Sequence, residues 1–366
     1  MKDFVFRSGT ELLFRNDLRQ TLAEITKGYK VMLVYGGGSV KRNGFYDDAV
    51  QAFKEAGTDF VEYGGSSREF EKIQKGIQVA RDNNVTMIVG AGGASVMDSA
   101  KLIAFGFYHE ADLWDYVKGK NPNGQQRLRL ALVPTYPSSG SENGLGAVSI
   151  DSRNGDFGTA YGIGADYAIL SPKYSLTLSH EMTIYTGLVT LVQLTACILG
   201  DRNVMSYDAG VSYIKNVVKA VKRLADHPDD LDARGIIMLG ASLSTSSRLG
   251  IGKEKFYAYD IYEIEFLPEK LFGSTYRRSL TSIFPRFLQI MARHHEVDIK
   301  KYFHDVFGWD GPVDESCSKL LEAFAKMGVE MYYDGKFTRQ QVDDIPCRTE
   351  LSNDEVYEMM QALVRR

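Results

Sequence analysis

The sequence is poor in cysteine, with three residues in 366, at positions 197, 317 and 347, and no CxxC pair. This spacing excludes a disulfide framework and makes a cysteine-based zinc site unexpected. It is typical of a protein in a reducing compartment. Histidine is also scarce, with six residues in the chain. A metal site that needs several imidazoles therefore has few donors to draw on.

The sequence also lacks a basic surplus, a leader and a long apolar run. Its formal net charge is −4 and its pI is about 5.9, which argues against a nucleic-acid groove. Residues 1–10 contain no apolar core of a signal peptide. The most apolar stretch, residues 186–200, contains Gln193 and is too short to span a bilayer. We therefore expect a soluble cytoplasmic protein with no membrane or nucleic-acid partner.

What is present is an ordinary globular composition, 44% hydrophobic and 25% charged, at a length typical of two domains. In the first half, strand-like runs at 30–35, 59–63, 85–89 and 128–134 alternate with helix-like runs at 18–26, 46–55, 68–83 and 95–107. This alternation predicts βαβ units and a parallel sheet with helices on both faces. Residues 4–7 and 11–15 are expected to form a hairpin.

Beyond residue 171 the pattern changes to long helical periodicity. The expected helices cover residues 183–199, 207–225, 231–248, 276–294, 298–307, 316–326 and 353–364. The sequence thus predicts an α/β domain over residues 1–171 and an all-helical domain over residues 172–366.

Glycine-rich turns follow three of the predicted strands, at the edge where open α/β sheets bind ligands. The first contains Gly37, Gly38 and Ser39, followed by two cations, Lys41 and Arg42. Glycines let backbone N–H groups approach a phosphate closely. The spacing is not GxGxxG, so the usual Rossmann fingerprint is absent, and a tight turn without a ligand explains this motif equally well.

The second turn leads into a helix through Gly92, Gly93 and Ser95, with Asp98 one turn further. Asp98 is either a ligand-binding carboxylate or one that only favours the helix N-terminus electrostatically. The third segment, residues 135–146, is rich in hydroxyls and glycine. It is either a cofactor-binding loop or a solvated surface loop.

Taken together, these segments resemble those of the iron-containing (group III) alcohol dehydrogenases, and most closely the branch of NADP-dependent butanol dehydrogenases and aldehyde reductases. The resemblance runs over the whole chain in the same order. It is carried by VYGGGSVKRNG (34–44), VGAGGASVMDSAK (89–101), TYPSSGSENGLGAV (135–148) and ILSPKYSLTLSHEMT (169–183).

The resemblance implies a dehydroquinate-synthase-like fold, with an α/β dinucleotide-binding domain, a helical domain and an active site in the cleft between them. It implies NAD(P)H as hydride carrier and a homodimer. The first turn would receive the adenosine 2′-phosphate. Ser39 stands where NAD-preferring members have a carboxylate, so NADP is expected rather than NAD.

The same resemblance assigns the other cofactor contacts. The second turn, with Gly92, Gly93 and Ser95, would hold the pyrophosphate, and Asp98 would face the nicotinamide amide. The loop residues would line the adenine and ribose side; they are Thr135, Ser139 and Ser141.

The sequence departs from the family at the metal site. The family places a divalent metal on one Asp and three His, and the corresponding positions here are Val189, Gln193, Tyr262 and Tyr276. An isopropyl group, an amide and two phenols are poor ligands for Fe²⁺ or Zn²⁺, so no metal is expected. A relocated metal on Asp260, Glu263 and Glu265 is the alternative.

Three smaller departures concern the cofactor site. Ala94 replaces the third glycine of the second turn. The turn at residues 65–67 is shorter than the family's Asn-Pro turn. A lysine that often reaches the nicotinamide ribose has no counterpart in residues 151–164.

The sequence therefore predicts an oxidoreductase that transfers a hydride between NADP(H) and an alcohol or aldehyde without the divalent metal. Tyr262 and Tyr276 would act as electrophile and proton donor, because a phenol donates a hydrogen bond to a developing oxyanion. Alternatively, the four replacements only repack an emptied cavity, and the protein is an inactive NADP(H)-binding sensor or scaffold. A lyase-like or transferase activity on the same scaffold is the third possibility.

Overall fold

The computed structural model describes residues 3–4, 6, 8–120, 126–200, 203–259, 261–345, 347 and 349–365. The chain divides into two units. The α/β unit contains Phe6–Leu178 and Ala241–Ser246, and the helical unit contains Met1–Val5, Ser179–Gly240 and Ser247–Arg366.

The α/β unit is built on a six-stranded sheet in the order β1-β8-β5-β4-β2-β3, and every pairing in it is parallel. β1 pairs with β8 in parallel, and in the predicted hairpin partner, residues 4–7, the described residues Phe4 and Phe6 are not in a strand, while Val5 and Arg7 lie outside the described residues. The strands are β1 (Glu11–Phe14), β2 (Val31–Tyr35), β3 (Phe60–Tyr63), β4 (Met87–Gly92), β5 (Arg129–Pro134) and β8 (Tyr167–Leu170).

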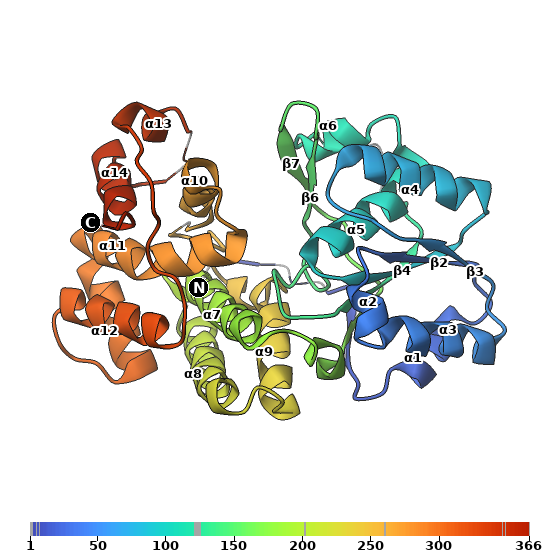
Figure 1. Cartoon of the computed structure of the whole chain (residues 1–366), viewed down its shortest axis with the longest axis horizontal. Coiled ribbons are helices and arrows are strands. Elements are labelled where there is room, and N and C mark those ends of the chain that lie inside the picture. Colours follow the sequence, from blue (N-terminus) through green and yellow to red (C-terminus); the bar gives the residue numbers. More distant parts are fainter. Residues whose placement is uncertain are drawn as a thin grey trace. The chain divides into compact units, whose positions relative to one another are not determined.

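Helices cover both faces of this sheet, as the alternating pattern predicts (Figure 1). Met32 and Val34 of β2 pack with α4 (Phe70–Asp82) and α5 (Ala94–His109), while Val31 and Leu33 pack with α1 (Arg19–Thr26) and α3 (Phe45–Ala56). Alternate residues of a strand point to opposite faces, so a strand buried on both sides is apolar throughout.

Short elements complete the α/β unit. They are α2 (Ser39–Arg42), α6 (Leu113–Val117), the 3₁₀ turn Pro172–Ser175 and an antiparallel pair of strands, β6 (Ala147–Ile150) and β7 (Phe157–Ala160). The sequence pattern did not predict β6, β7 or β8.

The unit boundary differs from the predicted one at residue 171. Residues 172–178 belong to the α/β unit, where the Tyr174 ring lies 5.3 Å from that of Phe45 and its hydroxyl donates to Asp48 at 2.7 Å. Residues Ala241–Ser246 also belong to it, because Thr245 Oγ1 donates to Gly140 O at 2.7 Å.

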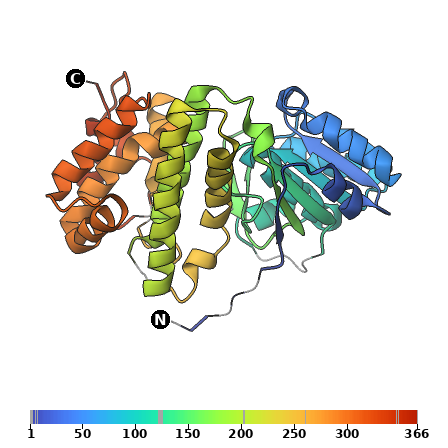
Figure 2. The same ribbon diagram turned by 90° about the horizontal axis from the view of Figure 1, so that it is seen from below.

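The helical unit is shown from two sides in Figures 1 and 2, in green to red. Its helices are α7 (His180–Ile198), α8 (Val204–Asp226), α9 (Leu231–Ser244, whose last residues belong to the α/β unit), α10 (Tyr262–Phe272), α11 (Tyr276–Phe307), α12 (Val313–Lys326), α13 (Arg339–Asp343) and α14 (Asn353–Ala362), with a 3₁₀ turn at Arg248–Gly250.

Helix α7 is the buried centre of this unit: every residue from Thr183 to Ile198 is buried. The helix is longer than the sequence pattern indicated, and by length and composition it could cross a membrane, so the prediction that it is too short was wrong. However, 89% of its apolar window is buried inside the protein, as expected for the core helix of a soluble domain.

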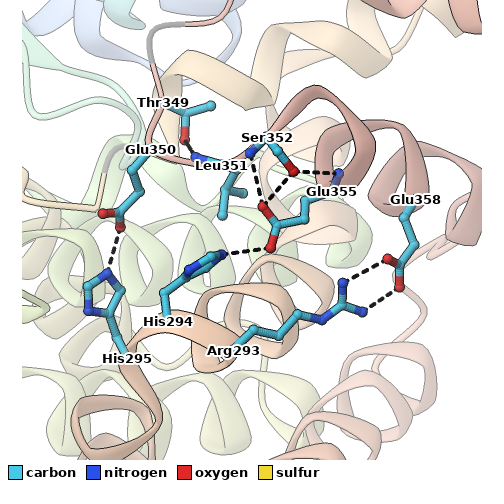
Figure 3. Close-up of polar contacts among 9 residues, drawn as sticks. All are labelled: Arg293, His294, His295, Thr349, Glu350, Leu351, Ser352, Glu355 and Glu358. Carbon is cyan, nitrogen blue, oxygen red and sulfur yellow. Dashed lines mark hydrogen bonds and ion pairs between the residues drawn. The ribbon is translucent and has the colours of Figure 1, made fainter.

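Helix α11 contains the break that the sequence predicts between residues 294 and 298, as a kink at His295 (φ −135°, ψ 44°). The C-terminal segment is tied to this kink by three polar pairs (Figure 3). These are Arg293–Glu358 at 2.5 Å, His294–Glu355 at 2.7 Å and His295–Glu350 at 2.9 Å.

The close packing of α5 on the sheet generates a stability prediction at Gly90, in β4. A Cβ on Gly90 would lie 2.6 Å from the Ala100 Cβ and 2.9 Å from Leu132 Cδ2, so Gly90→Ala overpacks the core. We expect a loss of about 1–3 kcal/mol in the free energy of unfolding, measured by urea denaturation. In Gly37→Ala the new methyl meets no atom within 4 Å. Equal losses in the two variants would contradict this packing.

Candidate functional site

The three glycine-rich turns lie at one edge of the α/β unit. They follow β2, β4 and β5, which are neighbours in the sheet and run in parallel, so their carboxyl ends meet at the same edge. Backbone hydrogen bonds connect the turns to their neighbours, from Gly65 N to Gly36 O at 2.9 Å and from Thr135 N to Gly92 O at 3.0 Å. The structure therefore brings the predicted cofactor-binding residues of all three segments to one edge.

In the first turn, Gly37 is a glycine that the fold itself does not require. Its φ is not positive, and a Cβ built on it would meet no atom within 4 Å. The neighbouring Gly38 has only the guanidinium of Arg42 close by, at 3.0 Å from such a Cβ. Ser39 begins α2 directly after these glycines. The turn is thus an open surface of backbone with a cation beside it, which suits an anionic ligand.

A second polar group flanks this turn. Glu62 accepts hydrogen bonds from the hydroxyls of Tyr46 at 2.5 Å and Tyr35 at 2.7 Å, and the Lys41 ammonium lies 4.5 Å from the Tyr46 ring centre. The bonds from Tyr46 and Tyr35 hold the pKa of Glu62 below its usual value. Burial, followed by the bond to Glu62, raises the pKa of Tyr35 to about 12.

In the second turn, contacts within the protein explain why glycine is needed at two positions. Gly92 has φ +158°, and a Cβ on it would lie 2.9 Å from Val96. A Cβ on Gly93 would lie 2.2 Å from the Tyr136 hydroxyl, so the ring of Tyr136 fills the space that this glycine leaves. Ser95 Oγ accepts from the backbone N–H of Arg68 at 3.1 Å and keeps its own proton to donate.

Asp98, one turn into α5, is held by three segments. Its Oδ1 accepts from Ser141 Oγ at 2.6 Å, and its Oδ2 accepts from Arg68 Nε at 2.8 Å and from Val148 N at 3.3 Å. Asp98 is therefore more than a carboxylate that favours a helix N-terminus, because it connects the loop after β5 to the turn before α4.

Lys101, which the sequence analysis did not single out, organises the same loop. It is fully buried and donates to Gly144 O at 2.8 Å and Gly146 O at 2.9 Å. Burial lowers the pKa of Lys101 to about 8, although Asp98 and Glu142 oppose the shift. Burial likewise raises the pKa of Glu142. A charged residue in an otherwise apolar helical run was the signal that could have found Lys101.

The loop after β5 is not a solvated surface loop. Thr135 and Ser141 are buried, while Ser139 is half-buried. Thr135 follows the last strand residue directly, and Ser141 is fixed by its bond to Asp98. The three residues thus lie in an ordered segment of the candidate cofactor edge.

In the helical unit, two of the four residues that the family resemblance assigns to the metal positions are in contact. Gln193 Nε2 donates to the Tyr276 hydroxyl at 3.3 Å, and Gln193 Oε1 is buried without a hydrogen-bond partner among the described residues. Val189 lies one turn earlier on α7 and is 2% exposed. The Tyr262 ring, at the start of α10, packs edge-on against Tyr257 at 4.9 Å.

These positions do not fit a divalent metal. Valine offers no donor atom, and an amide and two phenols are weak ligands. Across the described ranges, no three His, Cys, Asp or Glu side chains gather to hold a metal ion. Glu263 and Glu265 lie on α10, whereas Asp260, the third member of the relocated set, lies outside the described residues.

Comparisons of the sequence and of the fold with known proteins point to the same group of proteins. The profile of the iron-containing alcohol dehydrogenases matches residues 9–172. NADH-dependent butanol dehydrogenase A of Clostridium acetobutylicum is 27% identical, covering 90% of this chain and 88% of its own. The NADPH-dependent aldehyde reductase YqhD of Escherichia coli is 26% identical with the same coverage.

Solved structures confirm the predicted fold class. The crystal structure of NADH-dependent butanol dehydrogenase A from Thermotoga maritima has a TM-score of 0.90 at 23% identity, covering 100% of this chain and 99% of its own. The cofactor-free form of YqhD from Escherichia coli has a TM-score of 0.87 at 19% identity, covering 99% and 100%.

Lys101 generates a pH prediction. Unfolding returns its pKa from about 8 to the ordinary 10.5, so above pH 8 the unfolded state binds more protons and stability rises with pH. We expect the wild type to gain up to about 1.4 kcal/mol per pH unit over Lys101→Met between pH 8 and 9.5, measured by urea denaturation.

The matched control is Lys72→Met, which removes a half-exposed lysine paired with Glu69. Its stability is expected to run parallel to that of the wild type over the same range. A constant difference between wild type and Lys101→Met would contradict the depressed pKa.

Proposed function

Because the chain belongs to the iron-containing alcohol dehydrogenase family, we propose that it transfers a hydride between NADP(H) and an alcohol or aldehyde, without the family's divalent metal. Family membership supports the coarser part of this statement, an alcohol or aldehyde oxidoreductase with a nicotinamide cofactor. Named relatives include both an NADH-dependent and an NADPH-dependent enzyme, so the choice of NADP rests on residues of this chain.

The observation that carries the proposal is the open backbone at Gly37. Among the described residues, no atom lies within 4 Å of a Cβ built on this glycine, and Arg42 Nη1 lies 3.0 Å from a Cβ built on Gly38. Ser39 adds a hydroxyl and no negative charge, so a phosphate is favoured there over a bare ribose hydroxyl. We assign this turn to the adenosine 2′-phosphate and the Gly92–Gly93 turn with Ser95 to the pyrophosphate.

The remaining cofactor residues are assigned from the family resemblance. Asp98 would accept from the nicotinamide carboxamide, and Thr135, Ser139 and Ser141 would line the adenine and ribose. When bound, NADPH supplies a hydride from the nicotinamide ring, and the protein has to bind it, orient it and supply a proton to the product oxygen.

We assign the proton transfer to the tyrosines of the helical unit. The Tyr276 hydroxyl oxygen accepts a hydrogen bond from Gln193 Nε2 at 3.3 Å, and a phenol also carries one proton that it can donate. A phenol O–H aimed at a carbonyl oxygen stabilises the charge that develops on that oxygen and then delivers the proton. Tyr262 is the second candidate for this role. No step of this chemistry uses a metal, because the four positions offer no suitable donor set.

Two features of the whole protein stay predictions. A cytoplasmic location is consistent with the soluble fold and with α7 as a core helix, and homodimer formation is expected from the family resemblance. Light scattering on the purified protein measures the latter directly.

The cofactor assignment is tested with Gly37→Ala. The methyl group fits the free protein but occupies the space of the ligand, so we expect about tenfold weaker NADP⁺ binding (~1.4 kcal/mol) by titration calorimetry, with unchanged thermal stability. Gly9→Ala is the control, because its methyl also meets no atom within 4 Å but lies away from this edge. Undiminished NADP⁺ affinity in Gly37→Ala would refute the assignment.

The catalytic assignment is tested with Tyr276→Phe and Tyr262→Phe. For the proton donor we expect kcat for NADPH-dependent aldehyde reduction to fall about 10²-fold with little change in NADPH affinity. Assays follow dialysis against EDTA and elemental analysis of the protein. Tyr185→Phe is the control, since that hydroxyl accepts only from the backbone N–H of Glu330 in the helical unit.

Full turnover in both phenylalanine variants would exclude the tyrosine mechanism. Loss of wild-type activity on EDTA treatment, restored by Fe²⁺ or Zn²⁺, would exclude the metal-free one. Tight NADP(H) binding with no turnover of any aldehyde would favour the inactive sensor instead.

A further inference from the structure

The segment between β3 and α4 fixes one arginine over the start of α5. The backbone of Arg68 donates to Ser95 Oγ at 3.1 Å, and its carbonyl accepts from Ser149 Oγ at 3.0 Å and from Ile150 N at 2.9 Å. Arg68 is therefore held from two sides by its main chain, before its side chain makes any contact. The short turn at residues 65–67, where this chain departs from the family pattern, leads directly into it.

The side chain of Arg68 ends on Asp98. Both Nε and Nη2 lie 2.8 Å from Asp98 Oδ2. The Asp98 side chain is 5% exposed, whereas that of Arg68 is 31% exposed, so the guanidinium closes the solvent side of a buried carboxylate. Removing one partner of such a pair leaves an uncompensated buried charge.

The other contacts of Asp98 show which of its two carboxylate oxygens can still accept a hydrogen bond from a ligand. Oδ2 accepts from Arg68 and from Val148 N, while Oδ1 accepts from Ser141 Oγ and, within the described part of the chain, from no other donor. An ionised carboxylate oxygen accepts about two hydrogen bonds, so Oδ1 retains one position. The guanidinium thus fixes the rotation of the carboxylate, and with it the direction of the remaining acceptor position of Oδ1.

We propose that Arg68 is a positioning residue, which holds the Asp98 carboxylate in one orientation so that its Oδ1 accepts from the carboxamide of the nicotinamide cofactor. This inference rests on the proposed function and deepens it by dividing the cofactor into two halves. Arg68 acts on the nicotinamide half through Asp98, and the phosphate half is bound at the glycine turns without it.

The test compares two probes, NADP⁺ and its fragment 2′-phospho-ADP-ribose, which lacks the nicotinamide. For Arg68→Met we expect titration calorimetry to show at least tenfold weaker binding of NADP⁺ and a change below twofold for the fragment. Arg68→Lys keeps the positive charge but loses the planar guanidinium with its two parallel donors, so it is expected to recover part of the NADP⁺ affinity. If Arg68→Met fails to fold, Arg68→Lys, which is expected to fold, replaces it in the comparison.

The matched control is Arg127→Met. Arg127 pairs with Asp166 at 2.7 Å in the same unit, with side chains 21% and 26% exposed. This variant is expected to lose stability without changing the affinity for either probe. If the role of Arg68 were purely structural, Arg68→Met would likewise lose stability without a change in affinity for either probe.

Three outcomes overturn the inference. Equal weakening of both probes in Arg68→Met and Arg68→Lys would mean that the arginine contacts a phosphate or only holds the turn. Unchanged NADP⁺ affinity in both variants would mean that Asp98 needs no positioning. If the wild type binds neither probe, the proposed function itself is refuted. If the wild type binds both probes but the Arg68 variants behave like Arg127→Met, only the role of Arg68 is refuted.

Discussion

A lysine ammonium with no exposure to solvent has to be surrounded by hydrogen-bond acceptors, and the α/β unit is built to meet this need at Lys101. The carbonyls of Gly144 and Gly146 supply two of the bonds, so the loop after β5 has to return to α5 at this point. Asp98 lies one turn earlier on the same helix, and the returning loop brings Ser141 and the N–H of Val148 onto it. One buried cation thereby fixes the course of the loop after β5 against α5.

The glycines of the first and second turns have different structural causes, although the two turns look similar in the sequence. Gly92 and Gly93 are required because Val96 and Tyr136 occupy the space beside them, so either would be a glycine without any ligand. Gly37 has neither a positive φ nor a neighbour. Its openness is thus the stronger indication of a ligand. The contact between Tyr136 and Gly93 also means that a pyrophosphate at the second turn has to share the start of α5 with a phenol ring.

The sequence correctly predicted the helices and strands whose formation depends on residues close together in the chain. Periodicity marked β2, β4, β5, α3, α4 and α5, and a break at residue 295 marked the kink of α11. It failed where the cause is distant in the chain: β1 pairs with β8 across more than 150 residues, and only that pairing makes it a parallel strand. The same holds at the site. The predicted residues reach one edge through the sheet order, but the pair of Arg68 and Asp98 depends on a turn whose course no pattern indicates.

In the helical unit, the side chains at the positions that the resemblance assigns to the metal bear on whether these positions were only repacked. If the family's metal position had only been repacked, apolar side chains such as Val189 would suffice, because a buried polar atom without a partner costs about 1–3 kcal/mol. Gln193 is 2% exposed, and its Oε1 has no partner among the residues that the structure describes, while its Nε2 bonds to the half-buried Tyr276. A buried amide oxygen that carries this cost is better explained by a hydrogen-bond donor that binds beside it, and the hydroxyl of an alcohol is such a group.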